Sequence, residues 1–145
     1  MYKIREMKKT DINAINTLAE GEGNVHLHKK EQPVSEVTIE NILAGNLERL
    51  YVIEESGAVR AFILFELDKE SKQVHINKLT VEASYVKKGL DEHLYSKVER
   101  LADRGGYEQI MAEITTTSPV VHTFFEEKGW YRLNDSDEFC KGVNG

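Results

Sequence analysis

The sequence predicts an α/β (α+β) fold, in which helices flank a mixed, mainly antiparallel central sheet. Three observations lead to this prediction. Segments with helical and with strand periodicity alternate along the chain, three strand segments follow one another across short turns, and a long amphipathic helix separates two later strands. The 145 residues fit one domain, residues 1–145, which is long enough to bury a core of its own.

The first third of the chain predicts one strand and two helices. Tyr2 to Arg5 alternates as a short strand, and Thr10 or Asp11 can cap a helix that stops at Gly21 and Gly23. The inward face of this helix comprises Ile12, Ile15, Leu18 and Ala19.

The polar stretch Glu22–Gln32 predicts a loop. After it, Ser35 begins a second helix that Gly45 ends. The inward residues of this helix are expected to be Ile39, Ile42 and Leu43.

Three strands are predicted next, over Leu50–Glu54, Val59–Leu67 and Gln73–Val81. Ser56-Gly57 and the polar run 68–71 mark the turns between them, so the three strands form an antiparallel meander. In the third strand the apolar period of two slips by one residue around Asn77-Lys78. A slip of this kind predicts a β-bulge, and bulges favour places where strands separate around a ligand. A strand buried on both faces is the alternative interpretation.

The last part of the chain predicts a helix, a strand, a short helix and a hairpin. Leu90, Leu94, Val98 and Leu101 define the long helix over 88–104, which Gly105-Gly106 closes. The helical crossover makes the next strand, 107–114, parallel to the earlier one. The remaining elements are a short helix from Ser118-Pro119 to just before Gly129 and a hairpin of 130–133 with 138–140. The predicted order is β-α-α-β-β-β-α-β-α-β-β.

Composition narrows the functional classes. No apolar run approaches the roughly 18–20 residues that span a bilayer, and a net charge of −6 argues against general nucleic-acid binding. The single cysteine, Cys140, excludes an internal disulfide framework and fits the cytoplasm. His26 and His28 form an H-x-H pair without a cysteine or carboxylate cluster, so no metal is expected. The sequence leaves the oligomeric state open, a homodimer included.

The stretch from Leu79 to Asp91 carries the main functional signal. An apolar strand ends at Val81, a short polar segment follows, and Gly89 opens the long helix. A helix N-terminus offers unpaired N–H groups and the positive end of the helix dipole, which suit a phosphate. The stretch therefore points to a cofactor that carries a pyrophosphate.

The element order and these residues resemble the GNAT superfamily of N-acetyltransferases. Members carry a stretch L-x-V-x-P-x-x-R/Q-x-x-G-x-G/A, to which Leu79, Val81 and Gly89 match, and a final F-Y-E-K-x-G-F, which residues 124–130 match in character. The resemblance implies transfer of acetyl from acetyl-coenzyme A, used as a co-substrate, to a small-molecule or peptide amine. It also implies that the amine approaches from the loop Glu22–Gln32.

The resemblance implies a role for each position of the motif. The backbone of Leu79 and Val81 would pair with the pantetheine arm as with an added strand, and N–H groups from Lys87 through Asp91 would hold the pyrophosphate. The positions implied to contact the cofactor are Leu79, Val81, Val86, Lys87, Lys88, Gly89, Leu90, Asp91, Ser118 and Phe125.

Four of these positions depart from the family pattern. Val86 replaces an Arg or Gln, Asp91 replaces a Gly or Ala, Ser118 stands at an Asn, and Phe125 replaces the Tyr that serves as a general acid. The carboxylate of Asp91 suits its own helix but repels a pyrophosphate at short range. These departures support a second hypothesis, a GNAT-like domain that has lost the cofactor and acts as a binding or regulatory module.

His75 is the candidate catalytic base. It lies beside the predicted bulge and out of phase with Val74 and Ile76, at a position where some relatives carry a glutamate base. An imidazole there can accept a proton from an ammonium near neutral pH. The alternative is a partly exposed strand histidine without a catalytic role.

Overall fold

A computed structural model of the chain describes residues 2–21, 25–26, 34–45, 47–113, 119–133 and 138–143. Its strands form one mixed sheet in the order β1-β3-β4-β5-β6-β8-β7, with β2 paired to β5 outside this path. The strands are β1 (Tyr2–Glu6), β2 (Val25–His26), β3 (Glu48–Glu55), β4 (Ala58–Asp68), β5 (Gln73–Val81), β6 (Gln109–Glu113), β7 (Tyr131–Arg132) and β8 (Glu138–Gly142). The helices are α1 (Ile12–Glu20), α2 (Glu36–Leu43), α3 (Leu90–Arg104) and α4 (Pro119–Glu127), with 3-10 turns η1 (Lys9–Asp11) and η2 (Ala83–Lys88). The predicted fold class is confirmed, and the order of helices and strands matches the prediction except for the short strand β2 between α1 and α2.

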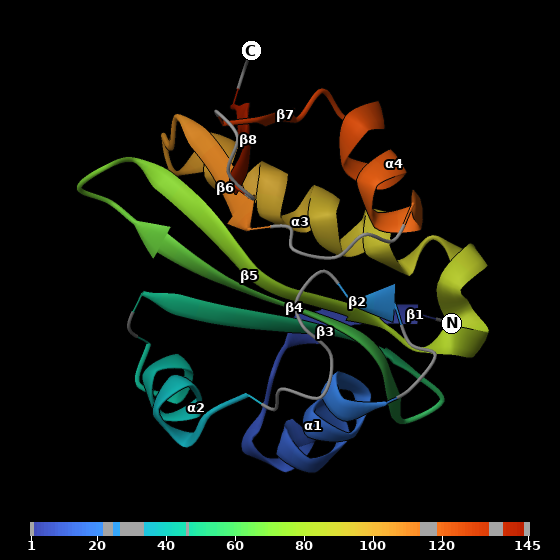
Figure 1. Cartoon of the computed structure of the whole chain (residues 1–145). Helices are drawn as coiled ribbons and strands as arrows, with labels where there is room; N and C mark the ends of the chain where they lie inside the picture. Colours follow the sequence, from blue (N-terminus) through green and yellow to red (C-terminus); the bar gives the residue numbers. More distant parts are fainter. Residues whose placement is uncertain are drawn as a thin grey trace.

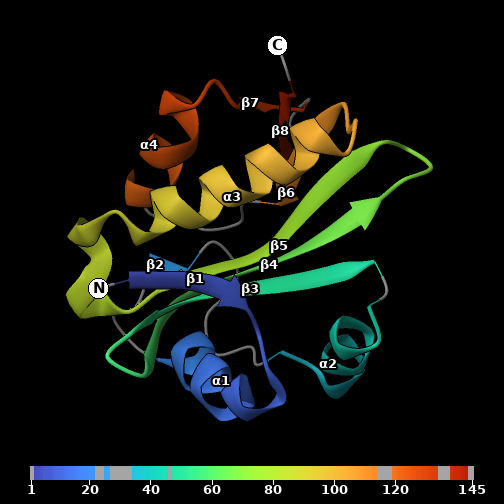
Figure 2. The same ribbon diagram turned by 180° about the vertical axis from the view of Figure 1, so that it is seen from behind.

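Helices cover both faces of the sheet. The views in Figures 1 and 2 place α3 and α4 on one face and α1 and α2 on the other. The core under α3 includes Ile53, Phe65, Ile76, Leu94 and Val98, and we call it the α3 core. The core under α1 and α2, called the α1 core, is smaller and includes Ile15, Leu18, Leu50, Val52, Phe62 and Leu64. Alternate residues of β3 and β4 thus enter opposite cores, as the period of two requires.

The predicted bulge in β5 is confirmed. Leu64 of β4 lies opposite Lys78 and the next residue, Phe65, lies opposite Ile76, so Asn77 is the extra residue. Asn77 is exposed. Because the strand absorbs this residue, Ile76 before it and Leu79 after it both enter the α3 core.

The crossover through α3 makes β6 parallel to β5, as predicted. Their pairing runs from Gln73 opposite Gln109 to Ile76 opposite Ala112 and, among the described residues, ends there. The second half of β5 therefore separates from β6 just where the bulge lies.

The loop predicted over Glu22–Gln32 is wrong at two residues. Val25 and His26 form β2, antiparallel to β5, with Val25 opposite Val81 and His26 opposite Thr80. The physical reason is the edge that β5 presents once β6 has diverged, because unpaired strand groups are satisfied by a passing segment. A two-residue pairing has too little periodicity to be read from sequence.

Two further details of the helices differ from the predictions. Asp11 stands at the N-cap of α1, but its carboxylate accepts from the Lys8 N–H and from Arg5 instead of capping the helix. Leu43, expected to point inward, is 49% exposed, because the residues that follow it are exposed and give it no cover. Ser35 caps α2 as predicted, accepting from the Thr38 N–H at 3.2 Å.

Candidate functional site

The end of β5 places the predicted pantetheine-binding residues at a sheet edge. The side chains of Leu79 and Val81 are buried in the α3 core, so only their backbone groups can face a ligand. The Glu82 N–H donates to the Arg60 carbonyl of β4 at 2.9 Å. Since backbone groups alternate along a strand, the N–H and C=O of Val81 and Leu79 point away from β4.

The edge at Val81 is paired with β2 in this structure. Val25 lies opposite Val81, whose backbone groups point toward it. The segment from which the resemblance brings the amine thus reaches the same edge as the expected pantetheine arm. A cofactor that paired with Val81 would have to replace this part of β2.

Gly89 begins α3 in a conformation suited to a close ligand. Its φ is 79°, in the left-handed region that favours glycine, and a Cβ placed there would meet no atom within 4 Å. The residue is therefore required by its backbone angle and borders open space. The 15-residue helix behind it directs its N-terminal N–H groups toward that space.

Asp91 introduces a negative charge into this helix terminus. Its Oδ1 accepts from the Glu92 N–H at 2.9 Å, so one of the first-turn donors is occupied by the protein itself. Burial raises the pKa of the Asp91 carboxyl, and the hydrogen bond from the Glu92 N–H offsets part of this shift. The site fits a phosphate at Gly89, whereas Asp91 opposes one.

The other positions of the motif have mixed placements. Lys88 is exposed, while Leu90 is fully buried in the α3 core and serves packing. Val86 and Lys87 lie within η2, and for these two residues the structure describes only the backbone. Ser118 and His28 lie outside the described residues.

Phe125 lies in the α3 core. It is 2% exposed, and its ring centroid is 4.7 Å from that of Trp130 and 6.3 Å from that of Tyr95. The Tyr95 hydroxyl accepts from Trp130 Nε1 at 2.8 Å, and burial strongly raises its pKa. The Tyr95 hydroxyl next to Phe125 is therefore committed to the core.

His75 lies in the first half of β5, between β4 and β6. Its neighbours in register are Glu66 on β4 and Met111 on β6. Val74 and Ile76 point into the α3 core, so His75 projects from the opposite face, on which α1 and α2 lie. The side chain is half-buried and lies two residues before the bulge residue.

A polar cluster next to the C-terminal end of β5 was not predicted. Arg60 Nη1 donates to Glu82 Oε2 at 3.0 Å, and the Tyr85 hydroxyl donates to Glu55 Oε1. The available signal was the meander register, which brings Arg60 of β4 beside Glu82 at the end of β5. Periodicity alone does not reveal such cross-strand pairs.

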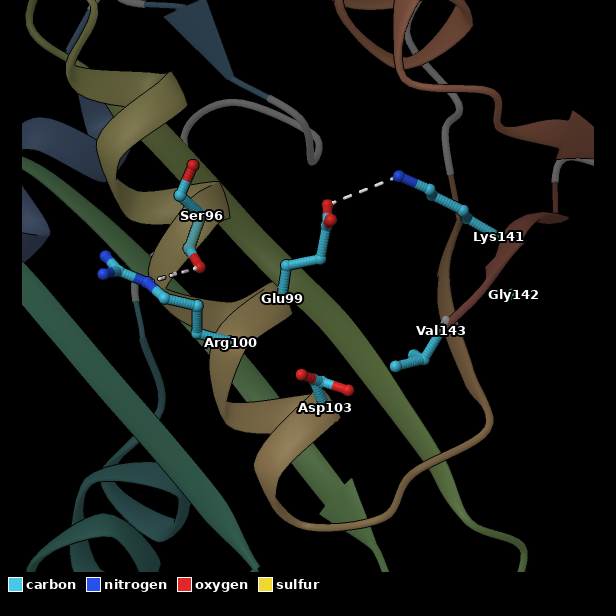
Figure 3. Close-up of a pocket in the computed structure, with 7 residues that line it drawn as sticks. All are labelled: Ser96, Glu99, Arg100, Asp103, Lys141, Gly142 and Val143. Carbon is cyan, nitrogen blue, oxygen red and sulfur yellow. Dashed lines mark hydrogen bonds and ion pairs between the residues drawn. The ribbon is translucent and has the colours of Figure 1, made fainter. Parts of the chain in front are cut away.

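A cavity of about 570 Å³ lies elsewhere in the described structure. Figure 3 shows it between the C-terminal half of α3 and the end of the chain, with Glu99 paired to Lys141 at 3.5 Å. Ten residues of helix separate Gly89 from Glu99, or about 15 Å. The cavity therefore belongs to a different part of the surface from the candidate site.

Two other classes of site are absent from the described residues. None of the helices there has the length and apolar character needed to span a membrane. Among the same residues, no three His, Cys, Asp or Glu side chains form a group that could hold a metal ion.

Comparisons with known proteins agree with this geometry. The family model described as "Acetyltransferase (GNAT) family" matches residues 10–130. No curated protein sequence matches the chain.

Solved structures share the fold at low sequence identity. PaiA N-acetyltransferase from Thermoplasma acidophilum, in complex with coenzyme A, is 13% identical with a TM-score of 0.78, covering 98% of this chain and 99% of its own. The ribosomal-protein-S18-alanine N-acetyltransferase from Escherichia coli is 15% identical with a TM-score of 0.76, covering 99% and 94%. N-acetylglutamate synthase from Neisseria gonorrhoeae, complexed with coenzyme A and N-acetyl-glutamate, is 19% identical with a TM-score of 0.76, covering 99% and 35%.

Proposed function

Because the chain belongs to the GNAT acetyltransferase family, we propose that it transfers acetyl from acetyl-coenzyme A to a small-molecule or peptide amine. The observation that carries the proposal is the end of β5. Its backbone groups point to an edge that β6 has left, and the strand leads through η2 to Gly89 and the N-terminus of α3. A strand edge followed by a helix N-terminus suits a ligand with an amide-bearing arm and a pyrophosphate.

The amine is proposed to approach from the α1 face of the sheet. His75 projects from that face, and the chain between α1 and α2 returns to β5 through β2. In the reaction a C–N bond forms, the C–S bond of the thioester breaks, and one ammonium proton must be accepted. We assign this proton to His75, directly or through one water molecule.

No tyrosine acid is proposed for the thiolate. Phe125 supplies no hydroxyl, and the Tyr95 hydroxyl is held by Trp130. A coenzyme A thiolate can leave without full protonation, so this arrangement is compatible with turnover.

The second candidate function, a binding or regulatory module without cofactor, is favoured by Asp91. Its carboxylate occupies a first-turn N–H that a phosphate would otherwise use. The proposal includes both small-molecule and peptide acceptors, since one structural neighbour is named for an alanine of a ribosomal protein and another is complexed with N-acetyl-glutamate.

Calorimetric titration with acetyl-coenzyme A separates the two functions. The enzyme predicts binding in the micromolar range. A flat titration at millimolar cofactor would contradict the enzyme and support the module.

We further propose that the protein works in the cytoplasm, on the basis of its single buried cysteine.

A further inference from the structure

The segment η2 is the covalent link between the strand edge of β5 and the helix N-terminus of α3. Tyr85, in the middle of η2, is four residues from Gly89. Its backbone N–H donates to the Glu82 carbonyl at 2.8 Å, and its ring packs edge-on against Tyr2 with centroids 6.4 Å apart. Contacts that hold Tyr85 in place therefore also hold the backbone segment that leads to Gly89.

Arg60 reaches this segment because of a second β-bulge. Ile53 of β3 lies opposite Ala61 and Glu54 lies opposite Val59, so Arg60 is the extra residue in β4. A bulge redirects the side chain of its extra residue. The Arg60 guanidinium lies 4.9 Å from the centroid of the Tyr85 ring, and Nη1 donates to Glu82 at 3.0 Å.

Glu55 completes the cluster from the last position of β3. It accepts from the Tyr85 hydroxyl, and the hydrogen bond lowers the pKa of its carboxyl and raises that of the Tyr85 phenol. Its carboxylate is 3.9 Å from Arg60 Nε, which is buried and finds no hydrogen-bond acceptor among the described residues. Two carboxylates thus face one guanidinium. The contacts of Tyr85 with Glu55 and Arg60 join η2 to the β3–β4 hairpin, and the Arg60–Glu82 bond holds the residue that precedes η2.

We propose that Arg60, Glu55 and Tyr85 are positioning residues that hold η2 on the β3–β4 hairpin and thereby orient the N-terminal donors of α3 toward the cofactor. We call these three residues the η2 clamp. They act through the backbone of 85–91 and make no contact with the reacting groups. The inference rests on the proposed function in naming the cofactor, and on the contacts alone in assigning the clamp to η2.

The first test measures amide hydrogen exchange of the full chain without ligand. Tyr85→Phe and Glu55→Gln each remove the hydroxyl–carboxylate bond, so exchange within 85–91 should accelerate by roughly tenfold. Arg60→Met should have the same effect, and Arg60→Lys should restore part of the protection because it keeps the charge. The matched control is Glu54→Gln, since Glu54 is adjacent on β3, similarly exposed and paired with Arg5 on the opposite face.

Unchanged exchange within 85–91 in Tyr85→Phe and Glu55→Gln would overturn the clamp, as would an equal acceleration in Glu54→Gln. A uniform rise in exchange across the whole chain would also overturn it, because the contacts would then support the fold in general. This measurement uses no cofactor. Its outcome is therefore independent of whether the protein is an acetyltransferase.

The second test titrates the same variants with coenzyme A. Wild-type binding, which tests the proposed function by itself, should weaken roughly tenfold in Tyr85→Phe and in Arg60→Met but not in Glu54→Gln. Partial recovery of affinity in Arg60→Lys supports the assignment. Accelerated exchange with unchanged coenzyme A affinity would overturn the link between clamp and cofactor.

Discussion

The two halves of β5 differ in what lies beside them. Residues 73–76 are paired with β4 on one side and with β6 on the other, whereas residues 79–81 keep β4 but have lost β6 and gained the two-residue β2. One bulge residue, Asn77, separates the halves, and both send apolar side chains into the α3 core. The strand β5 thus changes its hydrogen-bonding partner on one side along its length, while the same face packs against the α3 core throughout.

Deletion of Asn77 removes the residue that separates the two halves of β5 and should have the largest effect of the changes considered. Without the extra residue, Leu79 and Val81 would leave the α3 core and Lys78 and Thr80 would turn toward it, which should lower the free energy of unfolding by roughly 3–6 kcal/mol. Urea denaturation measures the change. Asn77→Ser, which keeps the chain length, should stay within about 1 kcal/mol of the wild type, and a deletion variant of equal stability would show that the bulge does not set the register.

His75→Ala tests whether the first half of β5 carries the base. Loss of a general base should lower kcat/KM by about 100-fold and remove the acidic limb of its pH profile. Release of free coenzyme A in the presence of a panel of amines provides the assay. His93→Ala, an exposed histidine on α3, is the control, and an unchanged pH profile in His75→Ala would remove this residue from the mechanism.

Asp91→Asn tests whether the N-terminus of α3, which follows the second half of β5, is a weakened phosphate site. Removing the negative charge should tighten coenzyme A binding by about tenfold, or about 1.4 kcal/mol, which lies between the values for two like charges about 4 Å apart in water and near a protein surface. Asp103→Asn, an exposed acid near the other end of α3, should leave the affinity unchanged. Equal affinity in wild type and Asp91→Asn would mean that repulsion is not what limits binding.

The same variant has a pH signature in stability. Because burial raises the pKa of Asp91 above the ordinary 3.8, the folded chain holds this proton more tightly than the unfolded chain does. The associated stability is complete below 3.8 and is lost as pH rises through the folded pKa. Asp91→Asn should therefore gain stability relative to the wild type near neutral pH and lose that advantage in acid, as urea denaturation at several pH values would measure.

Val25→Pro tests the edge of the second half of β5, where β2 pairs with it, and should have the smallest effect of the changes considered. Proline removes the N–H with which β2 pairs to Val81, so a competing pantetheine arm should bind about threefold more tightly. Val25→Ala keeps the N–H and is the control. Weaker coenzyme A binding in Val25→Pro would show that β2 supports the cofactor site instead of competing for it.

Much of the fold could be predicted because local periodicity and turn residues decided it. The phase slip at Asn77-Lys78 located the bulge, since only an extra residue lets Ile76 and Leu79 share one face. Ser56 and Gly57 marked the β3–β4 turn, in which both residues have positive φ. Val25–His26 could not be predicted, because their strand depends on an edge that exists only after β6 has diverged.

The candidate site was predicted only where a motif fixes the backbone. Gly89 was identified because it opens the long helix and matches the family motif, and the structure adds its left-handed φ. The η2 clamp was missed because Arg60, Glu55 and Tyr85 lie on different elements and meet only through the register of β3 and β4. Asp91 was singled out as a departure from the motif, but its bond to the Glu92 N–H depends on the side-chain rotamer and could not be read from the sequence.

The hydrogen bond between Trp130 and Tyr95 gives the protein a built-in optical reporter. Trp130 is the single tryptophan of the chain, is 6% exposed and joins the start of β7 to α3. Its emission should shift to longer wavelength when α3 separates from the last hairpin, because the indole then meets water. Intrinsic fluorescence therefore follows the packing of α3 on the second half of the chain without any added label.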